Sequence, residues 1–238
     1  MNLLSEQSLK NIALEHNEYI PVLERYNLDF CCKGGKTLKE ACFEKNISVD
    51  SILADFEINN NKKQVQMPFS EMNAEQLISY ILIHHHFYVK NAIPTILNHL
   101  GKVVSKHGER HPYIKEVIQL FEEVAEELIA HMQKEEQVLF PRIKKLFNSE
   151  LDQNTTVTYI NAPVQVMEEE HENAGAILYK IRAITSNYNA PENACTTHKI
   201  CLSELKEFEE DLHRHVHLEN NILFPMASKK IMQLGINL

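Results

Sequence analysis

Apolar residues recur every three or four positions along four long segments of the chain, which is the period of amphipathic α-helices. Asn73 with Gln76 three residues on resembles a capping box, which predicts the start of the first helix. Pro112 is a favoured first-turn residue and predicts the start of the second. The predicted inward stripes are Leu82, His86, Val89, Ile93, Leu97 and Leu100; Val117, Phe121, Val124, Leu128, His131, Glu135 and Val138; Val164, Met167, His171, Ala174, Leu178 and Ile181; and Leu205, Phe208, Leu212, His215, Glu219 and Ile222.

Polar residues interrupt these stripes in a repeated pattern. The segments HMQKEEQVLFP at 131–141 and HVHLENNILFP at 215–225 each place a His four residues before a Glu. Positions i and i+4 lie on the same face of an α-helix, so each segment offers an imidazole and a carboxylate to one point in space. Both segments close with Leu-Phe-Pro, which we expect to pack and to end the two helices.

The repeat extends upstream of both segments. His86 precedes His131 by 45 residues, and His171 precedes His215 by 44. Each interval holds one helix, a connection and half of another helix, which is the spacing of a four-helix bundle. The sequence therefore predicts an all-α protein in which two similar helical hairpins surround a central site.

Composition agrees with this fold class and excludes several functions. The chain has 238 residues, 44% of them hydrophobic, and only six Gly, which suits long helices and a sizeable core. Its formal charge of −9 argues against a nucleic-acid or anionic-membrane partner. Neither a signal-peptide pattern nor an 18-residue apolar run is present, and the Cys number is odd, so we expect a soluble cytoplasmic protein.

Three regions are expected. Residues 1–56 form a small helical domain that carries Cys31 and Cys32, residues 57–69 form a linker around the polar tract INNNKKQVQMP, and residues 70–238 form the bundle.

The polar residues in the core stripes predict a metal site, because an unpaired buried carboxylate costs several kcal/mol. If both carboxylates bridge, each of two metals receives two His and two carboxylate oxygens, and a bridging oxo or hydroxo group leaves one position open on each. Imidazole and carboxylate without thiolate favour iron or manganese over structural zinc, although ligand type alone leaves zinc and copper open. The six candidate ligands are His86, His131, Glu135, His171, His215 and Glu219.

The remaining polar residues near these positions are interpreted separately. Glu127 and Glu170 are candidates to hydrogen-bond the outer side of a metal ligand or to line a polar entry path to the site. An equally good interpretation is that both are charged residues on a solvated helix face. The residues expected on solvated faces are His84, His85, His198, His213 and His217.

The strings EEEHENAG at 168–175 and ENNILFP at 219–225, with the six candidate ligands, resemble the hemerythrin-like domain of the iron–sulfur cluster repair di-iron proteins. LDFCCKGGKTL at 28–38 resembles the short N-terminal domain of the same family, and PENACTTHK at 191–199 also resembles it. The resemblance thus covers nearly the whole chain. Two departures are His85, where an aromatic residue is expected, and Lys33 between the Cys pair and the glycines.

The resemblance implies a hemerythrin-like four-helix bundle with two iron ions, oxo- or hydroxo-bridged, in a bacterial cytoplasm. The family's first His falls on His86, eight residues before Pro94, and the other ligands on the five positions already named. It further implies a stress-response protein that restores iron–sulfur clusters damaged by nitric oxide or oxidants, with damaged iron–sulfur proteins as partners. Iron donation, nitric oxide chemistry, enzymatic turnover and a homodimer all stay open at this point.

The thiols divide into two groups. Cys31 and Cys32 are candidates for catalytic thiol or metal-transfer chemistry, because adjacent thiols close only a strained ring and are redox-labile. The alternative is that they fill a small helical core. Cys42, Cys195 and Cys201 are interpreted as structural.

Two other functions are compared with cluster repair. A hemerythrin-type protein that binds or senses oxygen or nitric oxide would share the bundle, but such proteins typically have a fifth His, and the Cys pair would have no role in it. A ferritin-like oxidase would show Glu-x-x-His on two helices, and that pattern is absent from the chain.

Overall fold

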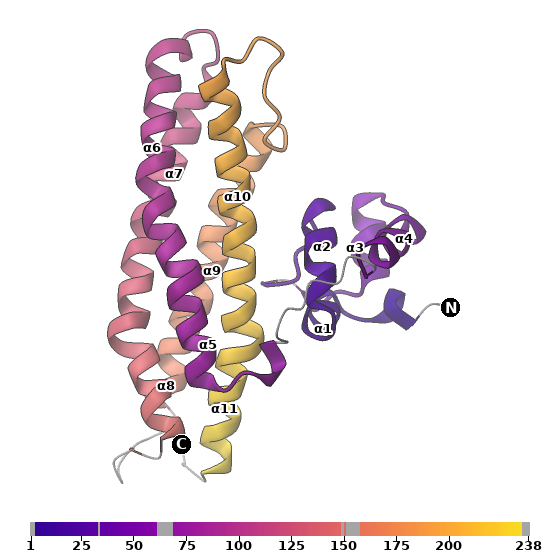
Figure 1. Ribbon diagram of the computed structural model, residues 1–238, viewed down its shortest axis with the longest axis vertical. Coiled ribbons are helices and arrows are strands. Elements are labelled where there is room, and N and C mark those ends of the chain that lie inside the picture. Colours follow the sequence, from indigo (N-terminus) through magenta and orange to yellow (C-terminus); the bar gives the residue numbers. More distant parts are fainter. Residues whose placement is uncertain (1–2, 33, 61–68, 149, 151–157, 235–238) are drawn as a thin grey trace.

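The computed structural model describes residues 3–32, 34–60, 69–148, 150 and 158–234. The N-terminal part is a small helical domain, and the rest is a bundle of long helices that stands beside it (Figure 1). The elements of the small domain are η1 (Leu3–Glu6), α1 (Leu9–Glu15), η2 (Asn17–Tyr19), α2 (Ile20–Arg25), α3 (Leu38–Lys45) and α4 (Val49–Asn60). The elements after it are η3 (Phe69–Glu71), α5 (Ala74–Tyr80), η4 (Ile81–His86), α6 (Phe87–His107), α7 (Tyr113–Lys134), η5 (Glu135–Leu139), α8 (Phe140–Phe147), α9 (Thr158–Ile184), α10 (Thr196–Leu218), η6 (Glu219–Leu223) and α11 (Phe224–Gln233).

The all-α prediction is confirmed, and four long helices form the bundle. Helix α6 packs against α7 and α10, and α9 packs against the same two helices. Asn73 begins α5 with the predicted capping box, in which its side chain accepts from the Gln76 N–H and the Gln76 side chain accepts from the Asn73 N–H. Helix α7 begins after Pro112, as its position predicted.

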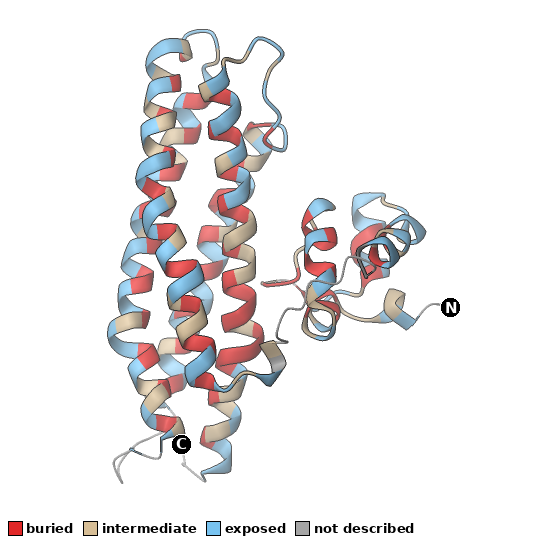
Figure 2. Ribbon diagram, in the orientation of Figure 1, coloured by how far each residue is buried: buried red, intermediate tan, exposed pale blue. Residues whose placement is uncertain are grey.

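The predicted inward stripes are buried along most of their length, and they form the red inner faces of the bundle in Figure 2. Val138 is an exception, because 39% of its surface is exposed while its neighbour Leu139 is buried. The prediction assumed an unbroken α-helical period. The chain instead makes a π-helical turn at η5, which shifts the register of the residues after Glu135.

Leu-Phe-Pro does not end the helices, and that expectation was wrong. Helix α8 continues from Phe140 to Phe147, and α11 continues from Phe224 to Gln233. Pro141 and Pro225 each stand in the first turn of these helices, directly after the π-turns η5 and η6. Proline has no N–H to donate and its ring clashes with the carbonyl four residues earlier, so a wider turn before it lets the helix go on.

The small domain is docked on helix α10. The Phe30 ring is 1% exposed and meets the edge of the His217 ring, with 5.3 Å between the ring centroids. The buried Glu24 carboxylate accepts two hydrogen bonds of 2.8 Å from the Arg214 guanidinium. Buried residues of the small domain and of the bundle therefore belong to one hydrophobic cluster.

The predicted linker at 57–69 lies largely outside the described residues, which omit 61–68. Its first residues belong to α4, which extends to Asn60, and Phe69 begins η3.

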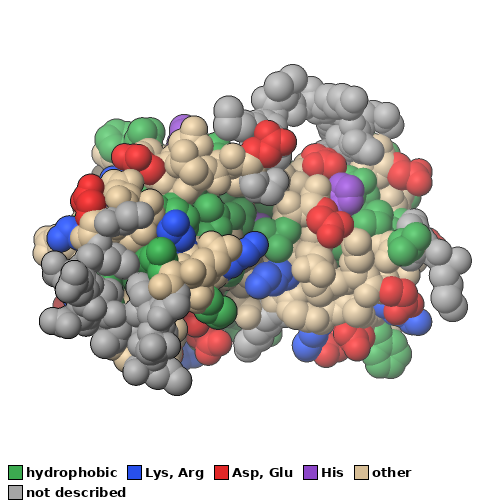
Figure 3. All heavy atoms as spheres, turned by 90° about the horizontal axis from the view of Figure 1, so that it is seen from below, with side chains coloured by type: hydrophobic (Ala, Val, Ile, Leu, Met, Phe, Trp, Pro, Cys, Tyr) green, Lys and Arg blue, Asp and Glu red, His purple; other side chains and the backbone are tan. Residues whose placement is uncertain are grey.

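The surface is consistent with the moderate net charge. Figure 3 shows acidic and basic side chains interspersed on the face seen from below. No helix within the described ranges combines the length and the hydropathy that crossing a membrane requires.

Truncating Phe30 tests the docking of the small domain. We expect Phe30→Ala to lower the free energy of unfolding by about 3 kcal/mol or more, because it leaves a cavity between the two domains. Phe43→Ala is the matched control, since Phe43 lies in the same domain and is 86% exposed. Chemical denaturation measures both variants, and equal stability of the two would contradict the docked arrangement.

Candidate metal centre

The six candidate ligands come from four long helical segments and meet in the core of the bundle. His86 ends η4, and Glu135 and Glu219 begin η5 and η6. His131, His171 and His215 stand in α7, α9 and α10. All six side chains are at most 2% exposed. Three of the four segments thus make a π-turn at a ligand position, which is a common feature of functional sites.

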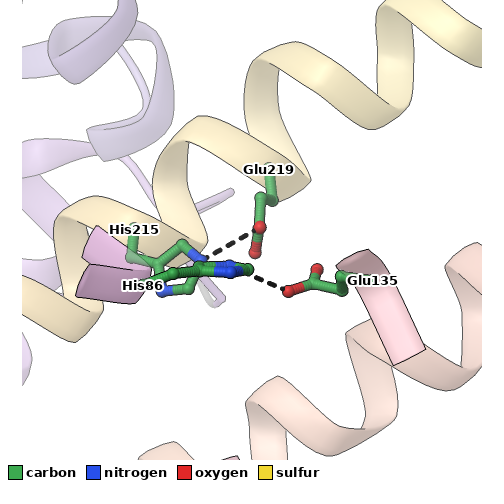
Figure 4. Close-up of side chains that lie close together, drawn as sticks. All are labelled: His86, Glu135, His215 and Glu219. Carbon is green, nitrogen blue, oxygen red and sulfur yellow. Dashed lines mark hydrogen bonds and ion pairs between the residues drawn. The ribbon is translucent and has the colours of Figure 1, made fainter. Parts of the chain in front are cut away.

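The six residues form two overlapping groups that share both carboxylates. One group is His86, Glu135, His215 and Glu219, and the other is His131, Glu135, His171 and Glu219. Within each group the ligand atoms lie within 4.8 Å of one another. Figure 4 shows the first group, in which the Glu135 and Glu219 carboxylates point toward the two imidazole rings.

The imidazole Nε2 atoms all face the carboxylates. Glu135 Oε2 lies 3.3 Å from Nε2 of His86 and 3.4 Å from Nε2 of His131. Glu219 Oε2 lies 3.2 Å from Nε2 of His171, and its Oε1 lies 3.0 Å from Nε2 of His215. The Nε2 atoms of His131 and His171 are 3.0 Å apart. Each carboxylate is therefore placed between one His of each group, as a bridging ligand would be.

The donor set fits a pair of cations. Both oxygens of Glu135, Oε2 of Glu219 and Nε2 of His86 are buried and have no hydrogen-bond partner among the described residues. Leaving buried polar atoms unsatisfied is costly, and cations at the centre of the six side chains would compensate them. Imidazole and carboxylate are also the donors that iron accepts.

The pKa values show how strongly the groups act on one another without a metal. Burial alone would lower the pKa of His131, but Glu135 and Glu219 raise it to about 9. Burial alone would raise the pKa of Glu219, but His215 and His171 hold it well below its ordinary value. Burial lowers the pKa of His215 and outweighs the opposing effect of Glu219. The site therefore combines an ionised Glu219 carboxylate with imidazoles of differing proton affinity.

Hydrogen bonds to outer carboxylates orient two of the imidazoles. Nδ1 of His86 lies 2.8 Å from Oε1 of Glu136, and Nδ1 of His131 lies 2.8 Å from Oε2 of Glu170. Each of these carboxylates also forms an ion pair with a lysine, Lys90 or Lys134. A carboxylate at Nδ1 keeps the proton there and leaves Nε2 free for a metal.

The two carboxylates that the sequence suggested as outer partners have different contacts. Glu170 contacts a candidate ligand, whereas Glu127 accepts hydrogen bonds from Asn173 instead. The sequence analysis missed Glu136 and Asn220, whose Oδ1 lies 2.9 Å from Nδ1 of His171. The signal was present, because each directly follows one of the two candidate carboxylates.

The Phe of each Leu-Phe-Pro segment packs on a His of the other helix in the same helical hairpin. Phe140 stacks on His86 with ring centroids 5.7 Å apart, and Phe224 stacks on His171 at 6.3 Å. These rings cover the site with apolar surface, so the repeat serves the site as well as the core.

Three of the His residues expected at solvated faces are buried, and the expectation was wrong for them. His85 lies against Asp211, with Nδ1 2.9 Å from Oδ1, because the π-turn η4 turns both His85 and His86 inward. His217 is covered by Phe30 of the docked domain. His198 is covered at the far end of the bundle, where its Nε2 lies 2.9 Å from the Tyr113 hydroxyl. His84 is exposed and His213 is half-buried.

The candidate catalytic thiols lie outside this centre, in the docked domain. Cys31 is buried and Cys32 is half-buried, and their Sγ atoms are 3.6 Å apart. Cys42 and Cys201 are buried in the hydrophobic cluster, which agrees with a structural role, and the half-buried Cys195 is the N-cap of α10.

Comparison with known proteins gives two family matches. The model described as Hemerythrin HHE cation binding domain matches residues 77–227, and the model described as Domain of Unknown function (DUF542) matches residues 5–60. The chain is 31% identical over 222 residues to the iron-sulfur cluster repair protein YtfE of Enterobacter sp. (strain 638). It is 32% identical over 222 residues to the proteins of the same name from Escherichia coli O81 (strain ED1a) and Escherichia fergusonii. Each alignment covers 93% of this chain and 96% of the relative.

Removing an outer carboxylate tests whether it tunes the site. We expect Glu136→Gln to lower iron affinity by about 10-fold to 100-fold, because the neutral amide no longer holds the His86 proton and orientation as a carboxylate does. Glu126→Gln on the exposed face of α7 is the matched control. Competition with a chelator measures both affinities, and an unchanged affinity in Glu136→Gln would show that its contact with His86 does not act on the metal.

The pH dependence of iron binding follows from the same geometry. Bound imidazoles must be neutral, so iron binding displaces protons, including the one that His131 holds up to a pKa of about 9 without metal. Protons therefore compete with iron at His131 already below about pH 9, and iron content is expected to keep falling into the mildly acidic range as further His residues are protonated. The folding stability of the metal-free chain depends on pH in the opposite direction. The contribution of protonated His131 to the free energy of unfolding is complete below its unfolded-state pKa and is lost as the pH rises through about 9.

Dialysis against a chelator over a series of pH values, followed by metal analysis, measures the loss of iron. A flat iron content across the mildly acidic range would mean that fewer His residues are ligands than the geometry indicates.

Proposed function

Because the chain belongs to the family of hemerythrin-domain iron–sulfur cluster repair proteins, we propose that it holds two iron ions between its long helices and uses them to restore damaged clusters. The proposed ligands are His86 and His215 for one ion, His131 and His171 for the other, and Glu135 and Glu219 for both. The observation that carries the proposal is the pair of buried carboxylates shared by two His pairs, with three of their four oxygens lacking a hydrogen-bond partner in the described chain.

A pair of ions is favoured over a single one by the arithmetic of the donors. One cation in either group would leave the other two imidazoles in the core without a metal, close to the same carboxylates. With two ions every Nε2 atom and both carboxylates have a cation to face. An oxo or hydroxo bridge between the ions is part of the proposal, because two His and two bridging oxygens leave each ion short of a full coordination set.

The chain's own residues prepare the site for this chemistry. Glu136 and Glu170 fix the Nδ1 protons of His86 and His131, so that the Nε2 lone pairs face inward. Phe140 and Phe224 limit access of water to the imidazoles. When bound, an iron pair of this kind supplies redox change and open coordination positions for small molecules such as nitric oxide or an oxidant.

The proposed substrate is an iron–sulfur protein whose cluster has lost iron or reacted with nitric oxide. The outer carboxylates are half-exposed and paired with the exposed Lys90 and Lys134, so a polar route joins the site to the surface on two sides. A cation can pass along such carboxylates at lower cost than through apolar side chains. Delivery of iron to the damaged cluster is therefore the form of repair that these side chains support best.

Substitution within the run His84-His85-His86 tests the proposal. We expect His86→Ala to lose at least about half of the bound iron and the repair activity, because it removes a buried ligand and leaves the remaining charges uncompensated. His84→Ala is the control two residues away on an exposed position. Metal analysis and restoration of a nitric oxide-inactivated iron–sulfur enzyme measure the two properties.

Three outcomes are decisive for that test. Two irons per chain and repair in the wild type and in His84→Ala, with loss in His86→Ala, support the proposal. One tightly bound zinc in place of iron contradicts it. Reversible binding of oxygen or nitric oxide without repair would favour a binding or sensing protein instead.

A further inference from the structure

A second cluster of metal-binding side chains lies outside the bundle core. Asp29, Cys31 and Cys32 place a carboxylate oxygen and two sulfur atoms within 4.8 Å of one another. We propose that these three residues form a separate site for one thiophilic divalent cation, and, resting on the proposed function, that the cation is Fe²⁺ on its way to a damaged cluster.

The geometry of the three donors is already close to that of a chelate. The Sγ atoms of Cys31 and Cys32 are 3.6 Å apart, and Sγ of Cys31 is 3.3 Å from Oδ1 of Asp29. The backbone N–H groups of Cys31 and Cys32 each donate a 3.0 Å hydrogen bond to the same Oδ1. The turn is therefore held in the conformation that brings both thiols to one side, and a cation needs no refolding of the loop.

The loop is fastened to the helix that carries part of the metal centre. Asn221 Nδ2 lies 3.3 Å from the carbonyl oxygens of Phe30 and Cys31. Asn221 belongs to the π-turn η6, which begins at the candidate bridging ligand Glu219. Phe30 also packs on His217. The Asn221 side chain thus links the loop of the second site to the π-turn that carries Glu219.

The thiols open onto a cleft that a second molecule can enter. The cleft has a volume of about 730 Å³ and lies between the small domain and helices α9 and α10. Its walls include Asp29, Cys31 and Cys32 on one side and Tyr179 and Glu209 on the other. Three protein donors leave coordination positions for water or for a ligand of an incoming protein, so the site suits a cation that is passed on.

The donor types select the cation. Two thiolates with a carboxylate favour Fe²⁺, Zn²⁺ or Co²⁺ over Mg²⁺ and Ca²⁺, which prefer oxygen ligands. The hydrogen bond with Cys32, burial and the carboxylate of Asp29 together hold the pKa of the Cys31 thiol well above its ordinary value. A bound cation stabilises the thiolate form and displaces the thiol protons, so cation binding strengthens as the pH rises.

Cobalt titration of the full-length protein tests the site, after loading to two irons per chain and a brief wash with a mild chelator to clear the thiol site. Co²⁺ bound to thiolate gives an intense near-ultraviolet charge-transfer band, whereas Co²⁺ on imidazole and carboxylate does not. We expect one additional equivalent of Co²⁺ with this band under anaerobic conditions, with a phosphine present to keep the thiols reduced. The band should disappear in the double variant Cys31→Ser, Cys32→Ser and weaken in Asp29→Asn, while the two irons of the bundle are retained.

Cys195→Ser is the matched control, because Cys195 is also a half-buried free thiol but has no partner thiol beside it in the described structure. It should leave the band unchanged. Absence of the band in the wild type, or its persistence in the double variant, overturns the site. Loss of the bundle iron in the double variant also overturns it, because the two sites would then be one.

A transfer assay separates the site from its role. The protein is loaded with ⁵⁷Fe and mixed with an iron–sulfur enzyme whose cluster has been inactivated by nitric oxide. Slower appearance of ⁵⁷Fe in the enzyme with the double variant than with Cys195→Ser supports the transfer role, and equal rates overturn it. If the wild type transfers no iron while the cobalt band is intact, iron delivery is contradicted both as the function of the protein and as the role of the thiol site. Metal binding by Asp29, Cys31 and Cys32 is then still supported.

Discussion

Two carboxylates buried in an apolar bundle are the constraint on which the rest of this structure depends. Glu135 and Glu219 have no exposed surface, and each faces two imidazoles at 3.0 to 3.4 Å. Such charges are tolerated in a core only with opposite charge close by. Without a metal, protonated His supplies it, and with metal the cations do. The four helices are therefore held together by a centre whose charge balance changes when it is filled, which couples bundle stability to metal content.

The π-turns shift the residues beside the candidate ligands away from the positions that an unbroken α-helix would give them. η4, η5 and η6 each end or begin at a candidate ligand, and two of them are followed by a proline after one intervening residue. A π-turn has less favourable hydrogen-bond geometry than an α-helical turn, but it rotates the residues that follow. Glu136 therefore reaches the imidazole of His86, and Asn220 reaches that of His171. The same rotation sends Phe140 and Phe224 onto His86 and His171. One local irregularity, used in both halves of the bundle, thus gives each half an outer partner and an apolar cover for its candidate ligands.

The small domain makes the two halves unequal. It contacts the second half of the bundle, through the Glu24–Arg214 ion pair and the Phe30 ring on α10, the Asn221 amide of η6, and a hydrogen bond from Asn27 to Asn187 after α9. Its adjacent thiols are consequently held near the half of the bundle that carries His215 and Glu219. In the proposed transfer of metal to another protein, this inequality would give the cation one preferred side on which to leave.

The sequence by itself determined the all-α class, the helix starts at Asn73 and Pro112, and the six candidate ligands, because helical periodicity and duplicated spacing are local properties. Their division into two groups that share both carboxylates agrees with the duplicated spacing of these residues along the chain. Only the tertiary structure decided the register after Glu135, the partners Glu136 and Asn220, and the burial of His85 and His217. These depend on π-turns and on the docking of Phe30 against α10, which bring together residues up to 191 positions apart in the chain. No local pattern encodes such contacts, because they form only when the packing of whole helices makes them favourable.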